Sequence, residues 1–397
     1  MKNHFKNINK PLFKEAFFAM LFSFLVLGVV SLISLNLSFF KPFENAFKDF
    51  SYLDLYYAEK LDDAEGDINQ NIVLVNINRL ERSEIAKLIN KLKAQKPSVI
   101  GLDVIFKQKK DSIGDQALAQ SLQGSNMVVA YEVTNTEVVK SISAIVSPDN
   151  KSAYTNFSFD PETAVARNFQ GYRKNGDSLE VAFGTAISKM FLKDKWQDDW
   201  EAYLLKERPI NFKGNRDNFL VLEYQDVMNL EEIPLVKDHI VLLGYLGDEL
   251  QHEFNLEDKH FTPMNSKFVG KSAPDTFGLV VHANIINMII TDNFIKVVPN
   301  WFLVFLTIVL TFIALAYFIW LAKRQLASYI LRLNIIRLAF MVVMVWIALL
   351  LFRSGVLLKT AGMIAVVAFS VGLIGYYKKL AHMLYKKFKW NGYFYHD

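Results

Sequence analysis

The sequence predicts an α/β domain outside the cytoplasm, anchored by four transmembrane helices. Long apolar runs lie near both ends of the chain, and lysine and arginine flank them. The residues between these runs are acidic. In that middle part, short apolar runs rich in β-branched residues alternate with amphipathic helical patterns, which is typical of parallel β–α–β units.

Charge is divided between the ends and the middle of the chain. Residues 1–40 carry a net charge of +3 and residues 297–397 carry +10, so the whole-chain value of +4 leaves −9 on residues 41–296. An acidic domain binds a phosphate backbone poorly, and we therefore expect no nucleic-acid partner. The absence of cysteine excludes disulfides, thiolate metal sites and a cysteine nucleophile.

Four segments have the length and apolarity of membrane spans: residues 16–40, 297–322, 335–352 and 360–377. A helix of about 20 apolar residues crosses a hydrocarbon core of about 30 Å. The first run has 25 residues without a charge. The apolar region of a cleaved signal peptide has only about 7–15 residues, so this run is expected to be a retained anchor.

The loops between the spans predict the orientation. Residues 1–15 hold four lysines or arginines, residues 323–337 four and the tail 378–397 five, whereas the turn 353–359 holds two. Because basic residues concentrate on the cytoplasmic side, both termini are expected in the cytoplasm and residues 41–296 in the periplasm of a bacterial inner-membrane protein. The lipid bilayer is then one expected partner. The basic tail is expected to anchor at the inner leaflet, with an amphipathic surface helix or a partner-docking segment as alternatives.

Strand and helix patterns alternate through the domain. A helix is expected between Ser83 and Pro97, with apolar residues on one face. The run 278–290 is strongly apolar but too short to span a membrane, so it is predicted as a core helix. Residues 132–178 are expected to be an irregular insertion with some strand, and 246–277 a long polar loop. The other predicted elements are strands at 72–75, 99–106, 127–131, 209–212 and 239–245 and helices at 115–122 and 178–191.

Two polar residues in the apolar helix 278–290 are candidate functional residues. Burying His282 and Asn284 costs free energy unless they are hydrogen-bonded. They are expected to contact either a ligand or a nearby loop, and pinning of the loop to the domain is the favoured role. That loop carries Asp258, Thr262 and Pro263.

Asp103 lies in an apolar strand, near its C-terminal end, and Gly244 ends the apolar run HIVLLG. Ligands of parallel α/β sheets bind beyond the carboxyl ends of the strands, so both are candidates to line one crevice. An aspartate at a strand end also caps loops and helices, and this structural role is favoured for Asp103.

Neither a metal nor a catalytic centre is predicted. Four residues offer nitrogen and oxygen ligands, but their spacing matches no recognised metal pattern. They are Asp258, His260, Asp275 and His282. The pair His252–Glu253 does not complete a zinc-protease motif, because Leu256 stands where the second histidine belongs. No nucleophile elbow, phosphate-binding loop or dinucleotide fingerprint occurs, so we expect no cofactor.

A series of short motifs, in order, carries a family resemblance. They are IVLVN (72–76), a helix with Ile85, Ala86, Leu88 and Ile89, VIGLDVIF (99–106), INF (210–212), IVLLG (240–244), DKHFTP (258–263) and GLVVHAN (278–284). This series, with one anchoring helix before it and three after it, resembles the CHASE2 extracytoplasmic sensory domain. Asn76 stands at a position that the family usually fills with aspartate.

The resemblance implies a sensory function. Family members usually carry a cytoplasmic histidine kinase, cyclase or serine/threonine kinase, but the 20 residues after Tyr377 are too few for a domain. The chain is therefore expected to relay a signal to a separate partner, such as a cytoplasmic signalling protein. The alternative is a structural or accessory subunit of an envelope complex that uses the domain as a docking surface, and an extracytoplasmic enzyme is least favoured. Sensors of this layout often form homo-oligomers.

Overall fold

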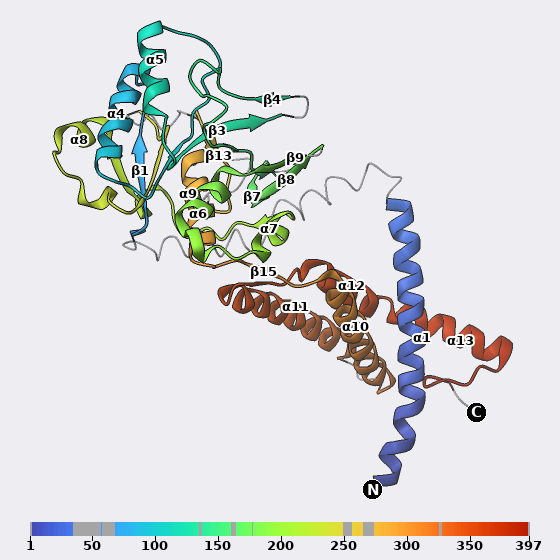
Figure 1. Ribbon diagram of the computed structural model, residues 1–397. Coiled ribbons are helices and arrows are strands. Elements are labelled where there is room, and N and C mark those ends of the chain that lie inside the picture. Colours follow the sequence, from blue (N-terminus) through green and yellow to red (C-terminus); the bar gives the residue numbers. More distant parts are fainter. Residues whose placement is uncertain are drawn as a thin grey trace. The chain divides into compact units, whose positions relative to one another are not determined.

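The computed structural model divides the chain into two compact units (Figure 1). Lys48–Ile295 form the globular domain, and Met1–Phe47 with Lys296–Asp397 form the transmembrane unit. The structure describes residues 2–34, 57, 68–134, 137–159, 164–176, 178–248, 256–264, 274–324 and 328–395.

A seven-stranded sheet organises the domain. Its strands are β1 (Ile72–Asn76), β2 (Val99–Leu102), β3 (Met127–Val133), β4 (Val138–Val139), β5 (Ser152–Tyr154), β11 (Leu220–Glu223) and β12 (Ile240–Gly244). The order is β11-β1-β12-β2-β3-β4, and β5 also pairs with β3. All pairings are parallel except β3 with β4. The predicted fold class, a mostly parallel mixed sheet with flanking helices, is confirmed.

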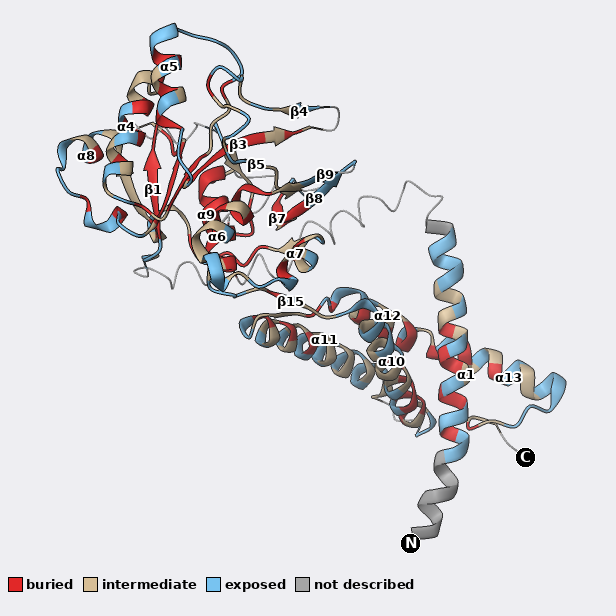
Figure 2. Cartoon of the chain, viewed as in Figure 1, coloured by how far each residue is buried: buried red, intermediate tan, exposed pale blue. Residues whose placement is uncertain are grey.

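Helices cover both faces of this sheet, as Figure 1 shows. One face carries α4 (Arg82–Ala94), α5 (Ser112–Ser121) and α8 (Tyr224–Asn229), and the other carries α6 (Phe183–Leu192) and α9 (Gly278–Ile290). Because successive side chains of a strand point to opposite faces, Val73 and Val75 join the first core and Ile72 and Leu74 the second. Figure 2 shows β1 buried along its length, as expected for a strand covered on both sides.

The predicted helix 178–191 was wrong in its first part. Ser178–Val181 form β9, which pairs with β8 (Tyr172–Asn175), and the helix α6 begins only at Phe183. Gly176, with φ +59°, allows the chain to reverse between the two strands. A Gly-Asp pair between two short extended runs favours a hairpin, and this local preference outweighs the apolar spacing that predicted a longer helix.

Other boundaries also differ from those predicted. The strand predicted at 99–106 ends at Leu102, and that predicted at 209–212 is the two-residue β10 (Arg208–Pro209). The insertion contains β6 (Ser158–Phe159) and β7 (Ala166–Phe169), and α7 (Asp199–Leu204), β11 and α8 were not predicted. The expected loop 246–277 includes β13 (Lys259–His260) and β14 (Thr276–Phe277), while its residues 249–255 and 265–273 lie outside the described residues.

The described part of the transmembrane unit has three helices long and apolar enough to cross a membrane. They are Lys10–Leu32 within α1 (Lys2–Ser34), α10 (Asn300–Lys323) and α11 (Tyr329–Arg353). A fourth span is available if α12 (Ala361–Gly372) and α13 (Ile374–Phe388), which meet at a 45° bend, count as one. The predicted span 360–377 thus contains a break at Leu373. Residues 35–40 of the first predicted span lie outside the described residues.

The end of the chain folds back onto α1. The carboxylate of Glu15, 3% exposed, accepts hydrogen bonds from the Tyr377 hydroxyl (3.0 Å) and from the backbone N–H of Tyr393 (2.7 Å). The Lys323 ammonium on α10 donates to the Tyr393 carbonyl at 2.8 Å. The segment after α13 is therefore joined to α1 through a buried carboxylate, whose hydrogen bonds offset its desolvation, and to α10 through Lys323.

Candidate functional site

Several candidate residues meet at one edge of the sheet. Parallel pairing sets Asn76 of β1 beside Gly244 of β12, and Leu243 of β12 beside Leu102 of β2. Asp103 follows directly, and its backbone N–H donates to the Leu243 carbonyl at 2.8 Å. Asp103 and Gly244 thus lie at the carboxyl edge, where parallel α/β sheets bind ligands.

Helix α9 brings an imidazole to Asp103. The Nε2 atom of His282 lies 3.9 Å from Oδ2 of Asp103, with the two side chains 4% and 18% exposed. The Nδ1 atom of His282 is buried and has no hydrogen-bond partner among the described residues. Burial raises the pKa of Asp103 to about 7, and the Asp258 carboxylate adds to this shift. Burial lowers the pKa of His282 to about 3, with a further contribution from His260.

The antiparallel strands β13 and β14 bring a second imidazole, His260 of β13, and the residue before β13 is a second acid, Asp258. The Nε2 atom of His260 lies 3.8 Å from Oδ1 of Asp258. The Asp258 carbonyl accepts a hydrogen bond from the backbone N–H of Gly278 at the start of α9 (3.0 Å). A Cβ atom at Gly278 would lie 3.2 Å from Oδ1 of Asp258 and 3.4 Å from Nε2 of His260, so glycine leaves room for both side chains.

Aromatic rings enclose the two imidazoles. The Phe157 ring lies 4.6 Å from the ring of His282 and 5.5 Å from that of His260. The Phe159 ring is 5.5 Å from His260, and the Phe183 ring of α6 is 5.1 Å from His282. The rings packed against His282 limit its contact with water, which favours the neutral imidazole. Phe157 and Phe159 were not among the predicted site residues. Their spacing, one aromatic residue on each side of Ser158, was the sequence feature that could have indicated them.

We call Asp103, Asp258, His260 and His282 the acid–histidine cluster. Its carboxylates can accept hydrogen bonds, and a neutral His282 can donate or accept through Nδ1. Within the described residues, no group of three or more histidines, aspartates or glutamates lies close enough to hold a metal ion. Asp275, the fourth residue considered as a ligand, accepts a hydrogen bond from the Thr276 hydroxyl at 3.0 Å.

Asn284 lies in the same helix but holds a different loop from the one expected. Its Oδ1 accepts from the backbone N–H groups of Lys213 (2.7 Å) and Gly214 (3.3 Å). Its Nδ2 donates to the carbonyls of Gly214 and Val280, both at 2.9 Å. Asn284 therefore fastens residues 213–214 to α9, and its side chain has no remaining strong hydrogen-bonding group for a ligand.

The other predicted residues stabilise the surroundings of the cluster. The Thr262 hydroxyl pairs with that of Thr276 at 2.9 Å, and Pro263 beside it is buried. At Gly244 a Cβ atom would lie 2.9 Å from Cδ1 of Leu279, so the glycine permits the close approach of α9 to β12.

Asn76, which stands in the first strand at a position that the family usually fills with aspartate, also has a structural role. Its Nδ2 donates to the Glu223 carboxylate and to the Gly247 carbonyl, both at 2.9 Å. Its Oδ1 accepts from the backbone N–H of Leu246 at 3.0 Å. An aspartate could not donate the first two bonds, so asparagine suits these contacts.

Along the sequence, the α/β domain that carries the cluster lies between membrane helices. The chain belongs to the CHASE2 domain family, whose model matches residues 24–318. No curated protein and no solved structure matches the chain. The protein is accordingly a multi-pass membrane protein with an extracytoplasmic domain of a sensory family, and no output domain is detected in the described residues after the match.

Proposed function

We propose that this protein is a sensory input protein of a bacterial inner membrane, with both termini in the cytoplasm. Its domain responds to a ligand at the acid–histidine cluster and transmits the change to a separate partner protein. The observation that carries the proposal is the pair of the buried His282 and the partly buried Asp103 at the carboxyl edge of the sheet. Perturbed ionisable groups cost folding free energy and gather at functional sites.

The cluster is connected to an element that can transmit a change. Asp258 accepts a hydrogen bond from the first residue of α9, and His282 lies one turn further along this helix. Helix α9 ends at Ile290, and only nine residues separate it from the membrane helix α10. A ligand that binds two states of the cluster differently would bias the position of α9, and such differential binding is the requirement for a signal.

The experiment is quantitative affinity purification of the tagged full chain from the membranes of cells that produce it. Wild type is compared with His282→Asn and with the exposed-site control Asn229→Ala on α8. The proposal predicts that a signalling protein co-purifies with the wild type and the control, and that its yield changes several-fold with His282→Asn. Thermal unfolding first shows that all three proteins are folded. Equal yields of the co-purified signalling protein from all three would then contradict a signalling role of the cluster.

A docking role is the second candidate. Val138, Phe159 and Leu179, on the short strands β4, β6 and β9, are between 36% and 44% exposed although they are large and apolar. Exposed apolar groups favour protein contacts when they are contiguous. This function predicts that envelope proteins co-purify in a fixed ratio to the chain. They should be lost with Val138→Ser and Leu179→Ser and retained with His282→Asn.

A further inference from the structure

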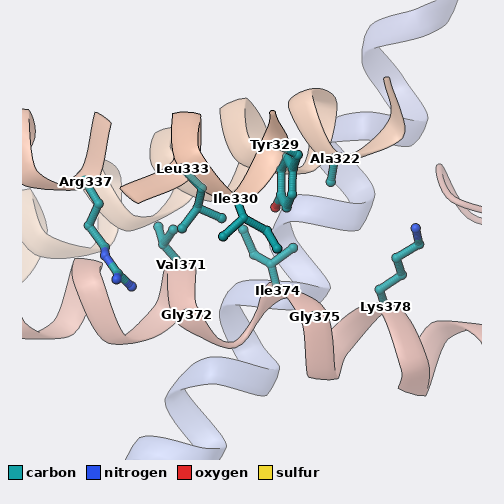
Figure 3. Close-up of a pocket in the computed structure, with 10 residues that line it drawn as sticks. All are labelled: Ala322, Tyr329, Ile330, Leu333, Arg337, Val371, Gly372, Ile374, Gly375 and Lys378. Carbon is teal, nitrogen blue, oxygen red and sulfur yellow. The ribbon is translucent and has the colours of Figure 1, made fainter. Parts of the chain in front are cut away.

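A cavity of about 550 Å³ opens between the helices of the transmembrane unit (Figure 3). It lies where the predicted fourth span breaks, because Gly372, Ile374 and Gly375 on both sides of Leu373 line it. The opposite side is formed by the first turns of α11 and the end of α10. Its volume is within the range of about 300–1,000 Å³ that is usual for ligand sites.

The lining combines a long apolar surface with two cations. Figure 3 shows Arg337 and Lys378 at the two ends of the row of lining side chains, with Leu333, Ile330 and Ile374 between them. Both basic side chains are half-buried. No lining residue is acidic.

Neither cation is neutralised by a carboxylate among the described residues. Arg337 donates to the Asn334 side chain at 3.2 Å, and the Lys378 ammonium lies 5.6 Å from the centre of the Phe394 ring. Glu15 is the acidic side chain in the described part of this unit, and it accepts from Tyr377 and Tyr393 instead. Two uncompensated positive charges therefore face a cavity within the membrane helices.

We infer that this cavity binds an anionic phospholipid. The anionic headgroup is attracted by the charges of Arg337 and Lys378 at the two ends of the lining, and the acyl chains lie along the apolar surface between α11 and α13. Basic pockets between membrane helices are suited to such headgroups, because each cation near the surface contributes attraction and the bilayer supplies the ligand. In the proposed orientation, this lipid comes from the cytoplasmic leaflet. The lipid site does not depend on the acid–histidine cluster, so a negative result here would leave the proposed sensory function unaffected.

Native mass spectrometry of the full chain in detergent tests this site. Phosphatidylglycerol, phosphatidylethanolamine and phosphatidylcholine of identical acyl chains are added separately, and the lipid-bound fraction is measured. We expect a preference for phosphatidylglycerol that falls about fivefold with Arg337→Gln or Lys378→Gln and roughly twenty-five-fold with both. Arg332→Gln with Lys386→Gln, on the same two helices but exposed and outside the lining, is the matched control and should keep the preference.

A second variant separates a cavity from simple surface attraction. A Cβ atom at Gly375 would meet no heavy atom within 4 Å, so Gly375→Leu is accommodated in the helix and fills the cavity without changing a charge. The proposed site predicts that Gly375→Leu reduces phosphatidylglycerol binding as strongly as the double charge variant. Unchanged binding by Gly375→Leu, or equal loss with the control pair, would overturn the proposal.

Discussion

Replacing Asn284 by alanine is expected to destabilise the domain by about 3 kcal/mol. The substitution removes the acceptor of two backbone N–H groups and the donor to the Gly214 carbonyl. Asn284 is fully buried and Gly214 is buried beside it, so the polar groups left behind gain no water in exchange. Each buried polar group that loses its partner costs about 1–3 kcal/mol.

Hydrogen exchange measured by mass spectrometry reports this loss in the full chain. The slowest amides of the central strand β12 exchange through global opening of the domain, so they should exchange roughly a hundredfold faster in Asn284→Ala. Asn229→Ala, at an exposed position, should leave them unchanged. Acceleration confined to residues 213–214 would show that Asn284 only holds its loop locally.

The substitution Asp103→Asn is expected to stabilise the domain above neutral pH. The native pKa of Asp103, about 7, lies above its ordinary value of 3.8, so the native state binds more protons than the unfolded state between about pH 4 and 7. The contribution of Asp103 to stability therefore falls as pH rises through this window. Each pKa unit corresponds to about 1.4 kcal/mol, and because the side chain is partly exposed we expect a gain on the order of 2–3 kcal/mol at pH 8.

His282 acts in the opposite direction. Its native pKa, about 3, lies below the ordinary 6.5, so the unfolded state binds the extra proton and stability rises with pH between about 3 and 6.5. The two slopes nearly cancel in the wild type. In Asp103→Asn the rising slope of His282 remains alone.

Thermal unfolding at a series of pH values measures this difference. The unfolding temperature of Asp103→Asn relative to the wild type should increase from pH 4 to 7 and stay constant above pH 7. Asp194→Asn, which removes an exposed carboxylate, should show no such increase. A difference in unfolding temperature that does not change with pH would mean that Asp103 is ionised over the whole pH range, as an ordinary surface aspartate is.

The sequence was most informative where a single physical term dominates. Fully buried strands such as 240–244 read as continuous apolar runs because both faces are covered, and the membrane spans were evident from apolar length. Asp103 was predicted inside a strand that continues to residue 106, whereas the strand ends at Leu102 and Asp103 follows it directly. The glycine at position 176 is the local turn signal for the hairpin that stands where the predicted helix was expected to begin.

The rest of the site depends on contacts distant in sequence. Phe157 reaches His282 across 125 positions of the chain, and nothing in the sequence around Phe157 indicates that partner. Asn284 was placed correctly in a buried helix, but its partners at 213–214 come from a segment without periodicity. Composition likewise cannot reveal the break at Leu373, because apolar residues continue through it.

The orientation of the domain can be measured directly, because the natural chain contains no cysteine. Ser178→Cys on β9 and Lys387→Cys on α13 each place one thiol at an exposed position. With a membrane-impermeant maleimide, spheroplasts should label Ser178→Cys fully, and Lys387→Cys only after the membrane is permeabilised. Labelling of Lys387→Cys in intact spheroplasts, with Ser178→Cys protected until permeabilisation, would contradict a sensory domain outside the cytoplasm.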